Sequence, residues 1–245
     1  MLQNDNVVYS FRGPMGIQVD IGSSILFLLG LILFVNINGS LVNGVIFIIM
    51  LVTSIFLHEL GHAWGNKIQG IPVRRIMLHG FGGFCQATRA GTPREQELIV
   101  AMGPIVNLVL WALAGIGKWW IMAAWIGALP DAASGQGAEI AWMEANQFKF
   151  QIWSYLNTFA FLNIALFVFN MLPVQPLDGG KLFHLGMLRL MDPRKALRVT
   201  GAVGLATSVL WIPAAIYLFF TLGFILFFFP SIKLHWEMYN GRAAF

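Results

Sequence analysis

Three ionisable side chains, His58, Glu59 and His62, lie near the end of an apolar run that covers residues 41–64. Residues four apart share one face of a helix, so the two imidazoles can bind one ion, with Glu59 beside them. Two helical histidines that bind zinc, next to a glutamate that acts as general base, are the chemistry of the H-E-x-x-H pattern. Ionisable groups at membrane depth cost at least about 2.5 kcal/mol each and are usually functional. We interpret the pattern as a zinc centre; ion pairing inside a helix bundle is the alternative.

A catalytic zinc centre needs a third protein ligand and keeps a fourth position open for water. Four side chains are candidates for that ligand: Asp178, His79, His184 and His235. Asp178 is favoured because it is an acid close to the end of a predicted membrane helix, and the glycines that follow it let the backbone turn inward. His184 is the second choice. For each of the three histidines, an interfacial or hydrogen-bonded side chain is the more common situation.

The composition predicts the surroundings of this centre. Of the 245 residues, 58% are hydrophobic and 11% are charged, whereas soluble domains are about 25% charged. We expect residues 1–245 to form one membrane-embedded domain without a separate soluble domain. The single cysteine, Cys85, excludes an internal disulfide and a thiolate metal cluster, and is expected to be a packing residue. Basic residues lie beside apolar segments rather than in a stripe, so the expected partner is the lipid bilayer and not nucleic acid.

The expected fold class is an all-α polytopic membrane protein with about six transmembrane helices and short interfacial β-hairpin or re-entrant elements. Clusters of Lys and Arg place both termini in the cytoplasm, because positive charge is retained on that side. Residues 199–230 are long for one crossing and short for two. The predicted spans are residues 21–35, 41–64, 97–117, 150–172 and 199–230, the last crossing twice if there are six.

The segments between the spans carry weaker patterns. Residues 7–20 alternate apolar and polar side chains around Gly13 and Pro14, which predicts two short strands joined by a turn. Residues 66–96 form a basic, cytoplasmic loop, in which the glycine-rich stretch 76–86 indicates a hairpin or re-entrant loop. Two further segments are expected outside the bilayer, an external loop at residues 131–146 and a basic amphipathic segment at residues 182–198.

Two motifs in this order resemble the site-2 protease family of intramembrane zinc metalloproteases, peptidase family M50. The first is H-E-L-G-H, and the second, more than 100 residues later, is Asn170-x-x-Pro173-x-x-x-Leu177-Asp178-Gly179. Shorter similarities occur at residues 16–19, 70–73 and 103–107. The resemblance implies a six-helix core with one zinc ion per chain, held by His58, His62 and Asp178 and reached from the cytoplasmic side. The chain is similar to a minimal form of the family, without PDZ or CBS domains.

The resemblance also implies a reaction, the hydrolysis of a peptide bond within or near the transmembrane segment of a single-span membrane protein, as in regulated intramembrane proteolysis. Glu59 would be the general base, and a neutral side chain would stabilise the oxyanion. Asn170 is the first candidate for this donor and Asn107 the second; helix capping or bridging is the alternative for both. The substrate helix must unwind, and an edge strand in residues 78–86 can pair with it, unless that loop is only a plug. The expected location is the cell (inner) membrane of a prokaryote.

Three other functions remain open from the sequence. A zinc-binding membrane scaffold or an inactive protease homologue would keep the ligands without hydrolysis, although the presence of Glu59 argues against it. A transporter is expected to repeat ionisable residues on a second membrane helix, and the sequence has no such repeat. A protease with glutamate as third ligand would need Glu139 or Glu144, both in the predicted external loop. The sequence predicts no oligomeric state.

Overall fold

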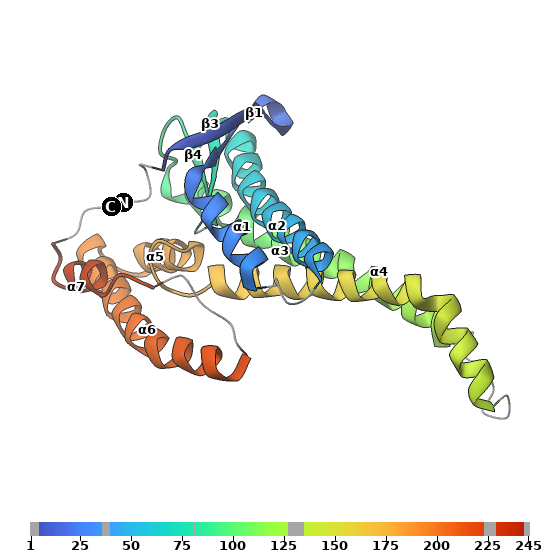
Figure 1. Ribbon diagram of the computed structural model, residues 1–245. Helices are drawn as coiled ribbons and strands as arrows, with labels where there is room; N and C mark the ends of the chain where they lie inside the picture. Colours follow the sequence, from blue (N-terminus) through green and yellow to red (C-terminus); the bar gives the residue numbers. More distant parts are fainter. Residues whose placement is uncertain (1–4, 36–39, 81, 127–134, 223–228, 243–245) are drawn as a thin grey trace.

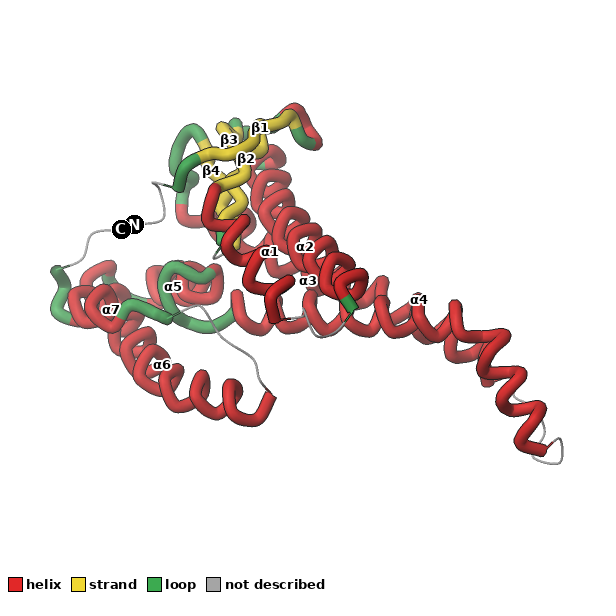
Figure 2. Tube along the Cα trace, viewed as in Figure 1, coloured by secondary structure: helices red, strands yellow, loops and turns green. Residues whose placement is uncertain are grey.

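Figures 1 and 2 show a computed structural model of the protein, which describes residues 5–35, 40–80, 82–126, 135–222 and 229–242. Helices dominate, and a small four-stranded sheet lies at one end of helices α1 (Ser23–Val35) and α2 (Leu41–Ile68). Among the described residues, four helices are long and apolar enough to cross a membrane. These four are α2 (Leu41–Ile68), α3 (Pro93–Ile126), α4 (Gly135–Asn170) and α6 (Pro193–Leu222).

The long helices present apolar side chains outward. Only 17% of an apolar stretch of 18 residues in α2 is buried inside the molecule, and the same fraction is buried in the corresponding stretch of α4. Leu113 on α3 and Leu210 on α6 are both more than half exposed. Apolar surface on this scale is unfavourable in water, whereas lipid tails accept it. The protein is therefore an integral, multi-pass membrane protein.

Helices α2 and α3 approach each other closely through two glycines of α2. A Cβ at Gly61 would lie 2.6 Å from the carbonyl oxygen of Met102, and a Cβ at Gly65 would lie 2.9 Å from Cα of Ile99. Glycines four apart share a helix face, and small residues let membrane helices gain van der Waals contact. The same face of α2 carries His58 and is thereby brought against α3. Helix α4 then runs beside α3 over most of its length (Figure 1).

Four short strands form two antiparallel hairpins, β1 (Val7–Arg12) with β2 (Gln18–Gly22) and β3 (Val73–His79) with β4 (Gly82–Ala87). Strands β2 and β3 pair in parallel, so the order is β1-β2-β3-β4 and β4 is an edge strand. Val19 and Ile76 of the sheet are fully buried in a core that includes Ala63 of α2. Burial of these aliphatic side chains holds the sheet on the C-terminal half of α2.

A buried carboxylate connects the strands. Asp20 of β2 is 1% exposed and accepts hydrogen bonds from Ser10, Gln18 and Arg75 at 2.7, 2.8 and 3.2 Å. Burial opposes ionisation, but these donors outweigh it and hold the pKa of Asp20 below its ordinary value. Arg75 of β3 also donates from Nε to Gln86 of β4 at 2.9 Å. The network therefore reaches from β1 to β4 and fixes the position of the edge strand.

Helices α5 (Asp178–Leu190), α6 and α7 (Ile232–Tyr239) form a second group, to one side of α2 and α3 (Figure 1). Helix α7 packs on α6 at Gly204, where a Cβ would overlap the imidazole of His235. His235 is fully buried; its Nδ1 lies 2.8 Å from the carbonyl oxygen of Ser231, and its Nε2 accepts the backbone N–H of Gln175 at 3.0 Å. Helix α7 therefore holds the turn that leads into α5.

The predicted strands in residues 7–20 and the predicted hairpin in residues 76–86 are confirmed. The external loop predicted for residues 131–146 is wrong for residues 135–146, which form the first turns of α4; residues 131–134 lie outside the described part of the chain. These turns lie alongside α3, and the rings of Trp125 and Trp142 are 6.2 Å apart. Packing against α3 stabilises a helix in a segment whose composition resembles a loop.

The predicted count of six spans is not confirmed. Helix α1 has 13 residues, whereas a crossing needs about 20. Within residues 199–230 the structure has one helix, α6, which continues through Pro213 to Leu222. Residues 223–228 lie outside the described residues. The basic amphipathic segment predicted for residues 182–198 is divided between two helices, since α5 ends at Leu190 and α6 begins at Pro193.

The contact between α2 and α3 leads to a prediction about stability. Gly65→Ala should destabilise the protein by about 1–3 kcal/mol, because the new methyl group overpacks the interface with Ile99. Gly115→Ala on α3 is the matched control, since a Cβ at Gly115 meets nothing within 4 Å. Thermal unfolding in detergent micelles compares the two variants with the wild type. Equal stability of both variants would show that the helices are not in close contact.

Candidate metal centre

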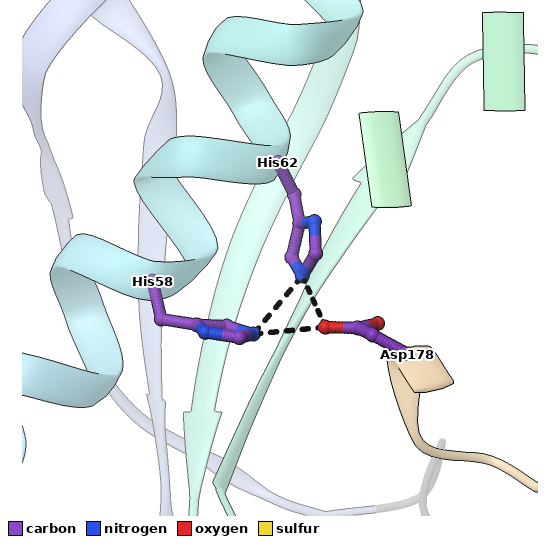
Figure 3. Close-up of side chains that lie close together, drawn as sticks. All are labelled: His58, His62 and Asp178. Atoms are coloured by element: carbon purple, nitrogen blue, oxygen red, sulfur yellow. Dashed lines mark hydrogen bonds and ion pairs between the residues drawn. The ribbon is translucent and has the colours of Figure 1, made fainter. Parts of the chain in front are cut away.

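Three side chains from two helices converge in the interior (Figure 3). Nε2 of His58, Nε2 of His62 and Oδ2 of Asp178 lie 3.1 Å from one another in each of the three pairs. All three residues are buried. Within the described part of the chain, they form the one group of at least three His, Cys, Asp or Glu side chains whose donor atoms lie close enough to share a metal ion.

The periodicity of α2 and a glycine of α3 make this convergence possible. His58 and His62 are one helical turn apart, and their rings meet edge to face with centroids 4.7 Å apart. Gly103 of α3 lies directly opposite, where a Cβ would be 2.7 Å from Nε2 of His58 and would also overlap His62. Any larger residue at position 103 would occupy the space in which the donor atoms meet.

The hydrogen bonds behind the two rings decide which nitrogen faces inward. Nδ1 of His62 lies 2.8 Å from the carbonyl oxygen of Ile99. A carbonyl oxygen only accepts, so this Nδ1 carries the hydrogen and Nε2 presents a lone pair. Nδ1 of His58 lies 2.5 Å from Oδ1 of Asn107 and has the same role. Both inward nitrogens therefore have the form in which imidazole binds metals.

The donor set fits a zinc ion. Two lone pairs and a carboxylate oxygen that face one another at 3.1 Å repel each other unless a cation lies among them. Tetrahedral zinc with bonds of about 2.0–2.1 Å keeps its ligands about 3.3 Å apart. Two histidines and one carboxylate are also a ligand set of catalytic zinc sites. The spacing and the chemistry of the three donors agree with each other.

Asp178 is the first residue of α5, and two glycines after it determine its position. A Cβ at Gly179 would overlap the backbone of Met171, and a Cβ at Gly180 would overlap the carbonyl group of Val174. Helix α5 therefore begins in direct contact with the turn that precedes it. This contact directs the carboxylate of Asp178 towards the histidines of α2 (Figure 3).

The second oxygen of Asp178 has its own partner. Oδ1 accepts a hydrogen bond from Nζ of Lys181 at 3.1 Å. The positive ammonium group beside the carboxylate favours its ionised form. The carboxylate is therefore ionised, as a metal ligand must be.

Glu59 is 5% exposed and interacts electrostatically with His62, His58 and Asp178. Its Cγ lies against β4, where a Cβ at Gly83 would be 2.6 Å away. A buried carboxylate thus lies next to both the three donor atoms and the edge strand. Cys85 of the same strand packs against the sheet core, as predicted. Burial, together with nearby Glu59, raises the pKa of its thiol to about 12 and keeps it protonated.

The three histidines that were alternatives to Asp178 lie elsewhere. His79 ends β3, with its ring 6.0 Å from that of Phe84. Nδ1 of His184 lies 3.1 Å from Oγ1 of Thr200. Both ring nitrogens of His235 have backbone partners, Gln175 in the turn before α5 and Ser231 at the N-cap of α7. The structure therefore brings only Asp178, of the four candidates, to the histidine pair.

The two candidate oxyanion donors occupy different places. The side-chain amide of Asn170 donates to the carbonyl of Leu166 at 3.0 Å, within the last turn of α4. Asn107 is fully buried on α3, with Oδ1 towards His58 and Nδ2 donating to Oδ1 of Asn163 at 2.9 Å. Sequence reasoning missed Asn163; the signal available was a lone asparagine inside an apolar helix, which needs a polar partner.

Comparisons with known proteins agree with these features. The family model for "Peptidase family M50" matches residues 46–211. The chain is 26% identical over 200 residues to a zinc metalloprotease of Methanocaldococcus jannaschii, a match that covers 80% of this chain and 50% of that protein. It is also 26% identical over 200 residues to Stage IV sporulation protein FB of Bacillus subtilis, covering 80% of this chain and 59% of that protein. The chain thus spans about half the length of the curated relatives it matches.

The fold is also similar to that of a solved structure, the site-2 protease from Methanocaldococcus jannaschii. The TM-score is 0.56 and the sequence identity is 21%, and the match covers 96% of this chain and 94% of that one. The arrangement of helices and sheet is therefore shared with that protein over nearly the whole chain.

The donor geometry predicts the zinc content of two variants. Asp178→Ala should weaken zinc binding more than about 100-fold, because removal of a ligand exceeds the effect of changing an outer hydrogen-bond partner. His184→Ala is the control, since its imidazole faces Thr200. The number of zinc ions per chain is measured after dialysis against chelators of increasing affinity for zinc. Full zinc retention by Asp178→Ala, or equal loss in both variants, would contradict the assignment.

Proposed function

Since the chain belongs to peptidase family M50, we propose that it is a zinc metalloprotease of the site-2 type, which hydrolyses a peptide bond within or near the transmembrane segment of a single-span membrane protein. The observation that carries the proposal is the group of three buried donor atoms 3.1 Å apart, with the carboxylate of Glu59 beside it, between apolar helices. The relative from Methanocaldococcus jannaschii, named a zinc metalloprotease, and the fold similarity to a site-2 protease support the same reading.

His58, His62 and Asp178 would hold one zinc ion per chain. When bound, zinc lowers the pKa of a coordinated water and polarises the carbonyl group of the substrate. Glu59 removes a proton from the attacking water and later returns a proton to the leaving amine. Its burial beside β4 keeps other water away from the carboxylate and holds it in one position. With three protein ligands, a bound zinc ion would keep a position for the reacting groups.

Asn170 is the better supported of the two oxyanion donors. It ends α4 immediately before the turn that leads to Asp178, and one of its two amide hydrogens remains available beyond the bond to Leu166. A neutral donor in a site from which water is excluded stabilises developing negative charge without a desolvated cation. Asn107 faces the outer side of the His58 ring, which favours a different role for it.

The substrate must present an extended backbone. A transmembrane helix satisfies its peptide groups internally, and lipid offers no substitute when the helix unwinds. Strand β4 has β3 as its one strand neighbour in the sheet, and its Gly83 lies against Glu59. We propose that the unwound substrate pairs with the outer edge of β4, which brings its peptide bonds towards Glu59.

The proposed location is the cell (inner) membrane of a prokaryote, with both termini in the cytoplasm. Lys67 at the end of α2 and Arg74 and Arg75 of β3 cluster at the sheet end of the bundle. Positive residues beside membrane helices are retained on the cytoplasmic side. The metal centre would then be reached from the cytoplasm.

The general-base role of Glu59 predicts the behaviour of Glu59→Gln. This variant should keep zinc and lose about 10²- to 10⁴-fold in turnover, because only proton transfer is removed. Substrates are identified as single-span proteins that co-purify with the variant and not with the wild type, and their cleavage is followed in proteoliposomes. Glu97→Gln is the control, since Glu97 pairs with Arg189 on the exposed surface. If the wild type binds zinc but cuts no helix offered to it, the protein is a scaffold.

Strand pairing makes a second prediction. Cys85→Pro in β4 should lower cleavage while zinc remains bound, because the register of β3 with β4 directs the backbone N–H of Cys85 to the outer edge, and proline removes this donor. Tyr9→Pro in β1, the opposite edge of the same sheet, is the matched control. Cleavage rates and zinc content are measured on the same preparations. Wild-type cleavage by Cys85→Pro would exclude pairing at this edge.

A further inference from the structure

A buried row of hydrogen bonds starts at His58 and crosses two neighbouring helices. Nδ1 of His58 lies 2.5 Å from Oδ1 of Asn107 on α3. Nδ2 of Asn107 donates to Oδ1 of Asn163 on α4 at 2.9 Å, and Nδ2 of Asn163 donates to Oγ of Ser54 at 3.0 Å. Ser54 is on α2, one turn before His58, so the row returns to the helix from which it began.

The direction of every hydrogen bond in this row is fixed by two backbone carbonyl groups. Nδ2 of Asn163 also lies 2.9 Å from the carbonyl oxygen of Phe159, and Oγ of Ser54 lies 2.8 Å from that of Met50. A carbonyl oxygen cannot donate, so the NH₂ of Asn163 must face Phe159, and the hydroxyl hydrogen of Ser54 must point to Met50. The reversed arrangement would place two oxygens against each other at Phe159.

The orientation of Asn163 also determines which nitrogen of His58 carries the hydrogen. Because the NH₂ of Asn163 is committed to Phe159 and Ser54, its oxygen faces α3 and accepts from Asn107. The oxygen of Asn107 therefore faces His58, and Nδ1 of His58 must be the donor. Nε2 is left with its lone pair on the side of Asp178.

We propose that Asn163, with Ser54 behind it, is a positioning residue that sets the tautomer and ring orientation of His58 for metal binding. The inference rests on the proposed function in so far as the bound metal is zinc. Asn163 acts through Asn107 and has no contact of its own with the three donor atoms in the row described above. It extends the site from α2 and α5 to α4, which also carries Asn170, the proposed oxyanion donor.

The contrast with the other histidine explains why such a row is useful. Nδ1 of His62 faces the carbonyl of Ile99, which cannot exchange donor for acceptor. His58 faces a side-chain amide, which presents a donor or an acceptor according to a rotation of about 180°. An unanchored Asn107 would stabilise both tautomers of His58, and one of them directs N–H at Asp178 and cannot bind a metal through Nε2. The anchors at Phe159 and Met50 remove that choice.

Burial isolates this row of hydrogen bonds from other partners. Asn107, Asn163 and Ser54 are each 0% exposed, so neither water nor lipid headgroups can replace a missing partner. Polar side chains between membrane helices also hold helices together, and this is the role that the experiment has to separate from positioning. A role in helix association alone would change stability and leave the affinity for zinc and the tautomer of His58 unchanged.

The first test is a double-mutant cycle on zinc affinity, measured in detergent by competition with a chelator. Asn163→Leu should weaken zinc binding about 10-fold and Asn107→Leu by about 10- to 100-fold, the range for partners of metal-binding histidines. The double variant should bind zinc as Asn107→Leu does, because Asn163 acts only through Asn107. Ser54→Ala is a milder variant in case Asn163→Leu does not fold, and should give a smaller loss in the same direction. Thr158→Val on α4 is the control, since Thr158 bonds only its own helix at Ser154.

The second test reads the tautomer directly and needs no activity. Nitrogen-15 NMR of histidine-labelled, metal-free protein at mildly alkaline pH should show His58 protonated at Nδ1, with its signals assigned by their loss in His58→Gln. In Asn163→Leu the signals should shift towards a mixture of tautomers, and in Thr158→Val they should not. Unchanged zinc affinity and an unchanged His58 tautomer in Asn163→Leu would overturn the proposal. A wild type that binds no zinc would instead contradict the proposed function, while the tautomer result would still stand.

Discussion

Lone pairs that face one another inside an apolar bundle need a cation, and this requirement links the main features of the structure. Nε2 of His58, Nε2 of His62 and Oδ2 of Asp178 meet at 3.1 Å in a place where neither water nor lipid relieves their repulsion. The close approach of α2 and α3 at Gly61, Gly65 and Gly103 brings the donors together, and a bound ion would offset the repulsion that this creates. Metal binding and helix packing are therefore expected to be coupled. Substitution of Gly103 by a larger residue would disturb both metal binding and helix packing.

The residues of the site are held in position by the surrounding structure to different degrees. Helix α2 contributes His58, Glu59 and His62 from about one helical turn, so their relative positions follow from helix geometry alone. Asp178 begins α5 directly after a turn, and its position depends on Gly179 and Gly180 and on the hydrogen bond from the N–H of Gln175 to His235. The C-terminal helix α7 thus contributes to the metal centre although it supplies no donor atom. Strand β4, which lies against Glu59, is held in place by the hydrogen bonds of Arg75 with Asp20 and Gln86.

The local patterns of the sequence were sufficient to predict the strands and to select three side chains that the structure brings together. A spacing of four identifies His58 and His62 as neighbours, and an acid followed by two glycines at a helix end identifies Asp178. The partners of these residues were not predictable in the same way, because Asn163 and Ser54 are 109 residues apart and meet only when α4 is placed against α2. Helix periodicity shows which face a residue occupies but not which helix lies opposite it. The length of α4 was missed for a similar reason, since its first turns are stabilised by α3 rather than by their own composition.

The most direct measurement is X-ray absorption at the zinc edge on the purified, active protein in detergent. We expect a first shell of light atoms only, with two imidazoles at about 2.0–2.1 Å, one carboxylate oxygen at about 2.0–2.2 Å and a further oxygen in the open position. The imidazole signals should fall by half in His58→Gln. A sulfur shell at about 2.3 Å, which would place the ion at Cys85, or a shell without imidazole would contradict a zinc centre formed by His58, His62 and Asp178.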